Sequence, residues 1–306
     1  MSQKKRSKSA GDLPWINPIG GFGDMLMLSG VLKQVHDRDE SRRFNMVLRT
    51  KYRHIFDEHP AIARLGHPPE NADMRRMDYW SIEDIGPGDK RPYQILAREY
   101  GLKTPVDEVF YLPNEVVEDP LLHNFIPWKE KNVLIAPASD SPRKCAPPHI
   151  WHQTVDMLLA AGAFVMQAGR LNELHIRNTY SLLSLTNVRQ AIALVKRCSL
   201  VITSDNFFMH ATHLTATPAI VLWGPTNHEV YGYSGQRHLQ MPKACDLGPY
   251  DDCIGPRRNK DGKTYGTPCP HGEGHCMNKA RPAEIFDAAR KLLAVRPASS
   301  SRRTPC

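Results

Sequence analysis

The stretch ITSDNFFMHATHLTATPAIVLWGPTNHEVYG, residues 202–232, places a strand, a helix and a second strand in close succession. Its first apolar residues lead into Asp205-Asn206, residue types that cap helix starts. A helical pattern then covers 206–214, and a continuous apolar run at 218–223 is typical of a buried strand. Strands that alternate with helices predict a parallel sheet covered by helices on both faces.

The same alternation extends over the second half of the chain. We predict strands at 132–136, 163–167, 199–203 and 218–223, and helices at 149–161, 172–180, 187–196 and 206–214. In the first half we predict strands at 15–19 and 44–48, and helices at 25–35, 51–65 and 92–100. The fold class is therefore α/β, and 306 residues suffice for two domains.

The domain organisation follows from shifts in composition. We expect a Rossmann-like domain at 14–128, a second domain at 129–280 that includes a Cys-rich segment at 245–276, and a last helix at 281–295. Residues 1–13 and 296–306 are rich in Ser and basic residues, and we expect disordered tails there.

The composition, 41% hydrophobic and 24% charged, is ordinary for a globular protein. The net charge of +8 comes partly from the tails. Two interpretations stay open: solubilising tails, or attraction to a polyanion such as a membrane surface, lipopolysaccharide or nucleic acid. No apolar run approaches the ~18–20 residues that span a bilayer. The basic start lacks a following apolar signal region, so we expect a cytoplasmic protein.

Open α/β sheets bind ligands outside the carboxyl ends of their strands. Four loops have this position: 20–24, 138–144, 169–173 and 204–210. In the first, glycines including Gly23 allow close backbone approach, and Asp24 is either a helix cap or a general base.

The other three loops carry groups that suit a nucleotide. Ser139, Ser141 and Lys144 suit phosphate oxygens, unless the loop is merely solvated. After Gly169, the Glu173 carboxylate suits ribose hydroxyls, or it faces a helix start. At 204–210 the helix start offers N–H groups to a diphosphate. His210 either adds to that site or is an ordinary core residue.

Residues 201–211 and 217–226, VITSDNFFMHA and TPAIVLWGPT, resemble the signature of glycosyltransferase family 9, the ADP-heptose heptosyltransferases of lipopolysaccharide core assembly and their relatives. The family also has an early Gly-Asp, here Gly23-Asp24, a phosphate-loop lysine, here Lys144, and a Gly then Glu, here Gly169 and Glu173. The resemblance covers about 14–36 and 132–293.

The resemblance implies a GT-B fold, with two Rossmann-like domains facing a cleft and a last helix that crosses back to the first domain. It implies an inverting transfer without a catalytic metal, in which Asp24 is the base. The donor-binding residues that it implies are Gly23, Ser139, Ser141, Lys144, Gly169, Glu173, Asp205, Asn206, Phe207 and His210. Asp205 either orients the sugar or holds the helix start. One departure stands out: Asn206-Phe207 replaces the family's Thr-Gly, and losing that glycine restricts how closely a diphosphate can approach.

Cys245, Cys253, Cys269 and Cys276 fall within one loop-rich segment, separated by seven, fifteen and six residues. Such a cluster in a chain without a leader favours a metal site over disulfides, and reduced thiols remain an alternative. Some family relatives, notably autotransporter heptosyltransferases, carry a cysteine-held iron in this region. We expect a structural iron or zinc.

The predicted activity is transfer of a sugar, heptose first, from a nucleotide sugar, ADP-heptose first, to an acceptor hydroxyl. The acceptor would be a glycan, a lipid-linked molecule or a protein, and the enzyme would lie in the cytoplasm or at the inner face of the membrane. Alternatives are a nucleotide-sugar epimerase of the same fold, a non-catalytic nucleotide-binding relative, and a glycosyltransferase acting on nucleic acid. The last is disfavoured because no nucleic-acid-binding motif is present. The sequence leaves the oligomeric state open.

Overall fold

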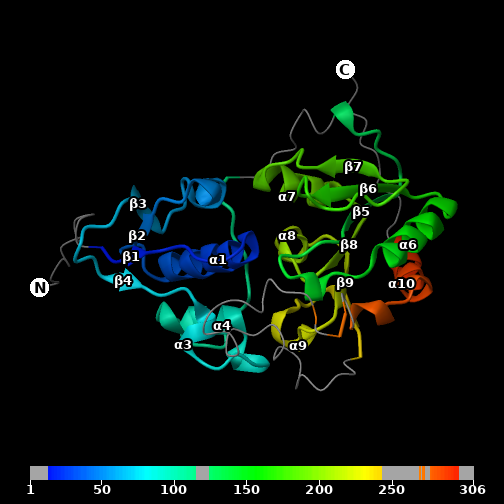
Figure 1. Cartoon of the computed structure of the whole chain (residues 1–306). Coiled ribbons are helices and arrows are strands. Elements are labelled where there is room, and N and C mark those ends of the chain that lie inside the picture. The colour runs from blue at the N-terminus through cyan, green and yellow to red at the C-terminus, as the bar shows by residue number, and fades with distance from the viewer. Residues whose placement is uncertain (1–12, 115–123, 243–268, 270, 273–275, 296–306) are drawn as a thin grey trace, which may run out of the picture. The chain divides into compact units, whose positions relative to one another are not determined.

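The computed structural model describes residues 13–114, 124–242, 269, 271–272 and 276–295 (Figure 1). The chain divides into two compact units near residue 117, earlier than the predicted boundary at 128. Each unit has its own parallel sheet. The predicted tails, except Leu13, lie outside the described residues, as does most of the Cys-rich segment.

The first unit has a four-stranded parallel sheet in the order β3-β2-β1-β4. Its strands are β1 (Trp15–Ile16), β2 (Phe44–Val47), β3 (Ile62–Gly66) and β4 (Met74–Arg75). Its helices are α1 (Phe22–Arg38), α2 (Arg53–Phe56), α3 (Tyr79–Ile82) and α4 (Pro92–Glu99). Single 3₁₀ turns lie at Thr50–Tyr52 and Gly88–Lys90.

Helix α1 confirms the helix predicted at 25–35 and is longer at both ends. Most of its 17 residues are buried, as expected for a helix with apolar residues on every face. Its outer face carries an ion pair between Lys33 and Asp37, one turn apart.

In the described part of the chain, neither this helix nor any other is both long and apolar enough to cross a membrane.

The helix predicted at 51–65 is wrong. Only Arg53–Phe56 is α-helical, and Ile62–Gly66 instead forms β3, which pairs with β2. The reason lies between them. Glu58 adopts a left-handed backbone with φ of 64°, and Pro60 has no N–H with which to continue a helix. The chain therefore turns and re-enters the sheet.

The second unit has a six-stranded parallel sheet in the order β10-β9-β8-β5-β6-β7. Its strands are β5 (Asn132–Ala136), β6 (Phe164–Gly169), β7 (Tyr180–Leu183), β8 (Leu200–Ser204), β9 (Ala219–Trp223) and β10 (Gln236–Gln240). The later helices of the chain are α6 (Pro148–Ala160), α7 (Val188–Arg197), α8 (Phe207–Thr215), α9 (His228–Tyr231) and α10 (Pro282–Val295), with 3₁₀ turns at Pro142–Lys144 and Met277–Lys279.

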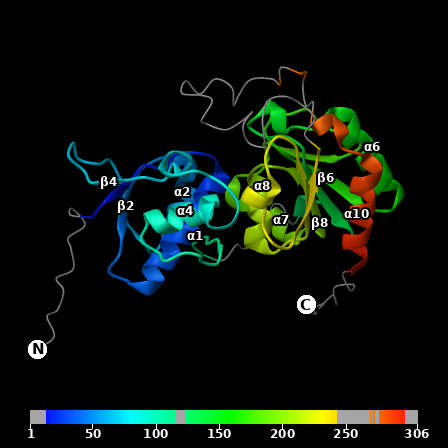
Figure 2. The same cartoon turned by 90° about the horizontal axis from the view of Figure 1, so that it is seen from below.

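Figure 2 shows α7 and α8 on one face of this sheet and α6 and α10 on the other. The central strands β5, β8 and β9 are buried at every residue. Burial on both faces explains why their sequences are continuous apolar runs rather than alternating patterns. The strands predicted at 132–136, 199–203 and 218–223 are confirmed within one residue.

The helix predicted at 172–180 is wrong, and the chain there reaches the edge strand β7 instead. The buried side chain of Gln167 accounts for the difference. Its amide donates to the carbonyl of Leu174 at 2.9 Å and accepts from the N–H of Ile176 at 2.7 Å. Those backbone groups are thereby satisfied without helical hydrogen bonds.

The last helix, predicted at 281–295, forms as α10. In the structure α10 packs on α6 and belongs to the second unit, because Ile285, Ala288 and Ala289 are buried in that unit's core.

Candidate functional site

The strand order of the second unit defines where a ligand is expected. From β5 the chain proceeds to β6 and β7 on one side, and from β8 to β9 and β10 on the other. The loops that leave the carboxyl ends of β5 and β8 therefore separate at this point, where open α/β sheets bind ligands. These are two of the four loops chosen from the sequence.

Lys144 and Asp205 meet at this switch point. The Nζ atom of Lys144 lies 2.7 Å from Oδ2 of Asp205, and only 11% of each side chain is exposed. The hydroxyl of Ser139 donates to the backbone carbonyl of Asp205 at 2.8 Å, which joins the two loops a second time. Burial of the two charges is costly unless they are paired, so the ion pair, which is neutral as a whole, fixes the position of the Lys144 ammonium at the end of the sheet.

The side chain of Asn206 links the end of β8 to the end of β5 through four hydrogen bonds. Its side-chain N–H₂ donates to the carbonyls of Ala136 at 3.0 Å and Ala138 at 2.7 Å. Its oxygen accepts from the N–H of Phe208 at 2.8 Å and from the hydroxyl of Thr203 at 2.9 Å. Two donors and two acceptors are all that an amide side chain offers. Asn206 therefore caps α8 and ties the end of β5 to it.

Phe207 is the first residue of α8, and its partly buried ring meets the ring of Phe208 edge-to-face, with centroids 5.4 Å apart. In a helix the Cα–Cβ bond tilts toward the N-terminus. The side chain of Phe207 therefore leans toward the end of α8 where an anion would bind.

His210 lies one turn into α8 and contacts Tyr233 from the loop before β10. Its Nδ1 atom lies 2.8 Å from the Tyr233 hydroxyl, and the Tyr233 ring stacks on His213 with centroids 4.3 Å apart. Burial lowers the pKa of His210 to about 4, helped by His213 and Lys144 and opposed by Asp205. His210 is thus neutral at pH 7.

Among the described residues of the second unit, two buried hydroxyls have no hydrogen-bond partner. Ser141 follows β5 and is fully buried, and Thr226 of the Gly-Pro-Thr loop is 2% exposed. Unsatisfied buried hydroxyls are uncommon, and a ligand can satisfy them. Beside Ser141, the thiol of Cys145 accepts from the N–H of Ser139 at 3.3 Å, and burial raises the pKa of that thiol.

Gly169 and Glu173 occupy the neighbouring strand end, after β6. The carboxylate of Glu173 lies over Gly169, so that a Cβ atom at Gly169 would fall 2.0 Å from its Oε2. Arg170 contacts Glu173 at 3.4 Å and Asp140 of the β5 loop at 2.9 Å. These contacts bring the predicted ribose-binding residues to the loop edge next to the switch point.

Asp24 lies at the corresponding place in the first unit, after β1, which has β2 on one side and β4 on the other. Its Oδ2 accepts from the N–H of Gly21 at 2.7 Å, and its Oδ1 accepts from the hydroxyl of Tyr79 at 3.0 Å. Asp24 thus caps α1 and also presents a positioned carboxylate. Gly20 has φ of 122° and packs on that carboxylate, while Gly23 is buried within α1.

The predicted metal ligands are only partly described. Cys245 and Cys253 lie outside the described residues, whereas Cys269 and Cys276 are thiols. Over the described ranges no group of three or more His, Cys, Asp or Glu side chains could hold a metal ion. Cys276 and Met277 pack on Gly224, where a Cβ atom would fall 2.5 Å from the Met277 sulfur. The chain that follows the Cys-rich segment is therefore anchored to the Gly-Pro-Thr loop.

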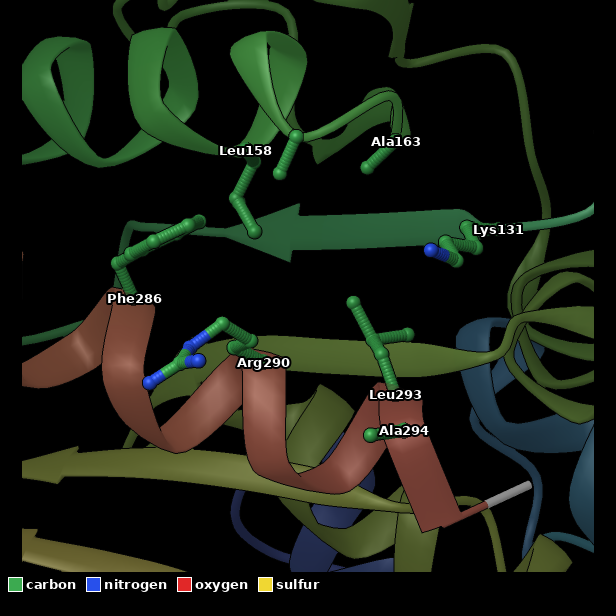
Figure 3. Close-up of a pocket in the computed structure, with 8 residues that line it drawn as sticks. Lys131, Leu158, Ala163, Phe286, Arg290, Leu293 and Ala294 are labelled. Carbon is green, nitrogen blue, oxygen red and sulfur yellow. The ribbon is translucent and has the colours of Figure 1, made fainter.

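A small apolar pocket between α6 and α10 is lined by Leu158, Leu293 and other side chains (Figure 3). Lys131 and Ala163 at its rim directly precede β5 and β6. The pocket therefore lies at the amino ends of these strands, away from the switch point, and takes no part in the site.

Tyr79 and Tyr233 contact predicted site residues but were not chosen from the sequence. Tyr79 is the first residue of the short helix α3, and Tyr233 lies in the loop between α9 and β10. The only available signal was their position near strand ends. Two tyrosines among ten in the chain are not distinguished by that alone.

Three solved structures illustrate the fold. The iron-containing dodecameric glycosyltransferase TibC from enterotoxigenic E. coli is 15% identical with a TM-score of 0.68, covering 92% of this chain and 76% of that one. ADP-heptose lipopolysaccharide heptosyltransferase II of E. coli is 14% identical with a TM-score of 0.66, covering 92% and 98%. The family 9 glycosyltransferase of Veillonella parvula is 14% identical with a TM-score of 0.63, covering 92% and 98%.

No curated protein matches the chain significantly in sequence. The family model "Glycosyltransferase family 9 (heptosyltransferase)" matches residues 91–243, which is half of the chain. This range includes Lys144, Glu173 and the 201–226 signature. The chain therefore belongs to glycosyltransferase family 9, has the GT-B fold and is a glycosyltransferase of the heptosyltransferase type.

Proposed function

We propose that this protein transfers heptose from ADP-heptose to an acceptor hydroxyl with inversion at the anomeric carbon. The observation that carries the proposal is the Lys144 ammonium at the sheet's switch point, which its ion pair with Asp205 holds in place. A localised cation at a strand end suits a nucleotide diphosphate. The structural relatives include a heptosyltransferase solved with ADP-heptose, which supports the choice of donor.

On the donor side, negative charge develops on the diphosphate as its bond to the sugar breaks. The Lys144 ammonium and the hydroxyl of Ser141 would stabilise that charge. Ser139, whose hydroxyl donates to the Asp205 carbonyl, would hold the two loops in position. Ser141 supports this role because its buried hydroxyl has no protein partner. Glu173 would accept hydrogen bonds from the ribose, beside Gly169. The N–H of Phe207 and the ring of His210 complete the proposed donor site, which Asn206 positions.

On the acceptor side, the Asp24 carboxylate would take the proton from the acceptor hydroxyl as its oxygen attacks. A bond then forms between that oxygen and the anomeric carbon, and the bond from the anomeric carbon to the diphosphate breaks, releasing ADP. Gly21 and Tyr79 orient the carboxylate. Because the Lys144 ammonium would stabilise the negative charge on the departing ADP, the proposed mechanism uses no catalytic metal.

For Cys245, Cys253, Cys269 and Cys276 we propose a structural iron or zinc. Four thiolates suit either metal, and a closed set of four leaves no open position for catalysis. Metal content per chain, measured on protein purified without chelator, tests this. Each Cys→Ser variant should lower the metal content if the four act together.

For the acceptor we propose a hydroxyl group, carried by a glycan, a lipid-linked molecule or a protein. A net charge of +8 attracts the protein electrostatically to anionic surfaces. We therefore propose a cytoplasmic enzyme that associates with the inner face of a membrane. Sedimentation with anionic vesicles, compared with neutral vesicles, tests the association.

Turnover of a panel of nucleotide sugars tests the function directly. ADP-heptose should be consumed, with ADP released, and Asp24→Asn should lower kcat by about 10² to 10⁴ while ADP affinity is kept. If no nucleotide sugar binds or is hydrolysed and Asp24→Asn changes nothing, the proposal fails. Release of an altered nucleotide sugar would instead show an epimerase, ADP binding without turnover a non-catalytic relative, and salt-sensitive DNA binding with DNA as acceptor a nucleic-acid glycosyltransferase.

A further inference from the structure

Tyr233 is held firmly against the first turns of α8. It is 4% exposed, its ring stacks on His213 at an interplanar angle of 17°, and its hydroxyl lies 2.8 Å from Nδ1 of His210. Gln236 fixes the same loop to α8, donating to the carbonyl of Met209 at 2.8 Å. The tyrosine hydroxyl therefore has a defined position relative to the imidazole.

The direction of the hydrogen bond follows from acid–base strength. A phenol is the better proton donor of the pair, and a neutral imidazole nitrogen is the better acceptor. The Tyr233 hydroxyl should donate and Nδ1 should accept. In a neutral imidazole only one nitrogen carries a proton, so that proton is then on Nε2.

We propose that Tyr233 is a positioning residue for the donor site: by donating to Nδ1 of His210 it keeps the imidazole proton on Nε2, which makes His210 a neutral hydrogen-bond donor to the donor's diphosphate. The proposal rests on the proposed function, because it assumes that α8 begins at the diphosphate site. It assigns a role to a residue outside the 201–226 signature.

The charged and titratable groups around His210 agree with a neutral ring. Lys144 and His213 disfavour a second proton on the imidazole, and Asp205 favours it. Because the carboxylate of Asp205 is already paired with Lys144, its pull on the imidazole is partly offset. A neutral donor adds a hydrogen bond to the diphosphate without adding a second cation that would have to be buried.

The tautomer and the pKa of the His210 imidazole can be measured without any ligand. In the full-length protein with ¹⁵N-labelled histidine, the His210 signals are assigned by their loss in His210→Gln. In the unmodified protein at pH 7, His210 should be neutral with its proton on Nε2. In Tyr233→Phe, which keeps the ring that stacks on His213, the Nδ1–H form should increase, and the pKa of His210 should rise toward its ordinary value because the hydrogen bond to the neutral form is lost.

ADP affinity is the second readout. Tyr233→Phe should bind ADP about three- to tenfold more weakly, the usual effect of losing one well-placed hydrogen bond. The matched control is Tyr180→Phe, which removes a tyrosine hydroxyl that donates to the backbone carbonyl of Phe125 at 2.8 Å. That control should leave the His210 tautomer and the ADP affinity unchanged.

The outcomes separate this inference from the proposed function. A His210 proton on Nδ1 in the unmodified protein, or a tautomer and pKa that Tyr233→Phe leaves unchanged, overturns the role of Tyr233 even if ADP binds. Failure of the unmodified protein to bind ADP overturns both the proposed function and the diphosphate role of His210. The expected tautomer together with weakened ADP binding in Tyr233→Phe alone supports both.

Discussion

The Lys144 ammonium and the Asp205 carboxylate form a 2.7 Å ion pair where β5 and β8 diverge, with only 11% of each side chain exposed. The pair joins a loop after one strand to a loop after another that lies about sixty residues later in the chain. It fixes the position of the Lys144 ammonium at the strand ends, and the Asp205 carboxylate balances that charge in the protein without ligand. Three predictions follow from this arrangement and its surroundings, and a fourth concerns His59 of the first unit.

Lys144→Met should weaken ADP binding more than tenfold, because the charge opposite the diphosphate is lost. It should also lower the free energy of unfolding by about 3 kcal/mol, since Asp205 is left buried without its partner. Calorimetry with ADP and urea denaturation measure the two effects.

Lys33→Met is the matched control for removing one lysine charge. Lys33 pairs with Asp37 on the outer face of α1, where the side chains are 30% and 52% exposed. Such pairs contribute less than about 1 kcal/mol. Equal ADP affinity in Lys144→Met and Lys33→Met would contradict a diphosphate role for Lys144.

Asn206→Ala and Asn206→Asp should both lower the free energy of unfolding by about 2–4 kcal/mol, because each removes the side-chain N–H donors to the carbonyls of Ala136 and Ala138 and leaves Ala136 with the Thr203 hydroxyl alone. The aspartate still caps α8 but cannot donate, so it should not rescue the loss. Asn187→Ala is the control: Asn187 is the N-cap of α7, and its side-chain oxygen accepts from Gln190. Losing this cap should cost only about 1 kcal/mol. A cost at Asn206 no larger than that at Asn187 would show that Asn206 is a cap alone.

Phe207→Gly should strengthen ADP binding several-fold, because it removes the side chain that leans toward the anion-binding end of α8. Phe207→Ala removes the ring but keeps Cβ, and the gain should be smaller. The glycine variant should lose about 1 kcal/mol of stability relative to the alanine variant, the usual helix penalty. If neither variant gains ADP affinity, the phenylalanine does not restrict the ligand.

The stability of the protein should fall as the pH drops from about 6.5 to about 4, partly because of His59. His59 is 2% exposed; one ring nitrogen contacts the Ser29 carbonyl at 3.0 Å and the other accepts from the N–H of Ala61. Burial lowers the pKa of His59 to about 4 in the folded protein, while in the unfolded chain it stays near 6.5. Between these values the unfolded chain binds the extra proton, so unfolding is favoured by about 1.4 kcal/mol for each pH unit.

Urea denaturation at several pH values measures this slope. His59→Gln should be less stable at pH 7 but should depend less on pH between 4 and 6.5. The exposed His54 provides the control, and His54→Gln should keep the slope of the unmodified protein. An undiminished slope in His59→Gln would remove His59 as the cause. His210, whose pKa is lowered in the same way, contributes a slope of the same sign.

Local sequence was sufficient to predict an element of secondary structure where burial alone determines that element. The strands at 132–136 and 218–223 were predictable because burial on both faces requires an unbroken apolar run. The segment at 172–180 was not, because its backbone is satisfied by Gln167 from a neighbouring strand rather than by itself. The segment at 51–65 failed for a local reason, since Glu58 and Pro60 interrupt a pattern that otherwise looks helical.

The candidate site divides in the same way. Asp24, Lys144 and Asp205 could be named from the sequence because each lies between a strand that the sequence itself predicts and the helix after it, or in the first turn of that helix. Tyr79 and Tyr233 could not, because a tyrosine becomes a partner of Asp24 or His210 only through contacts 55 and 23 residues apart in the chain.

By itself, the sequence determined the α/β class, the family signature and the strand-end loops that carry the chemistry, because these depend on residue types at short spacing. Only the tertiary structure decided which loops meet. The order β8-β5 brings Lys144 to Asp205 and lets Asn206 join the ends of both strands. Strand order is set by packing between segments distant in the chain, and no local pattern encodes it.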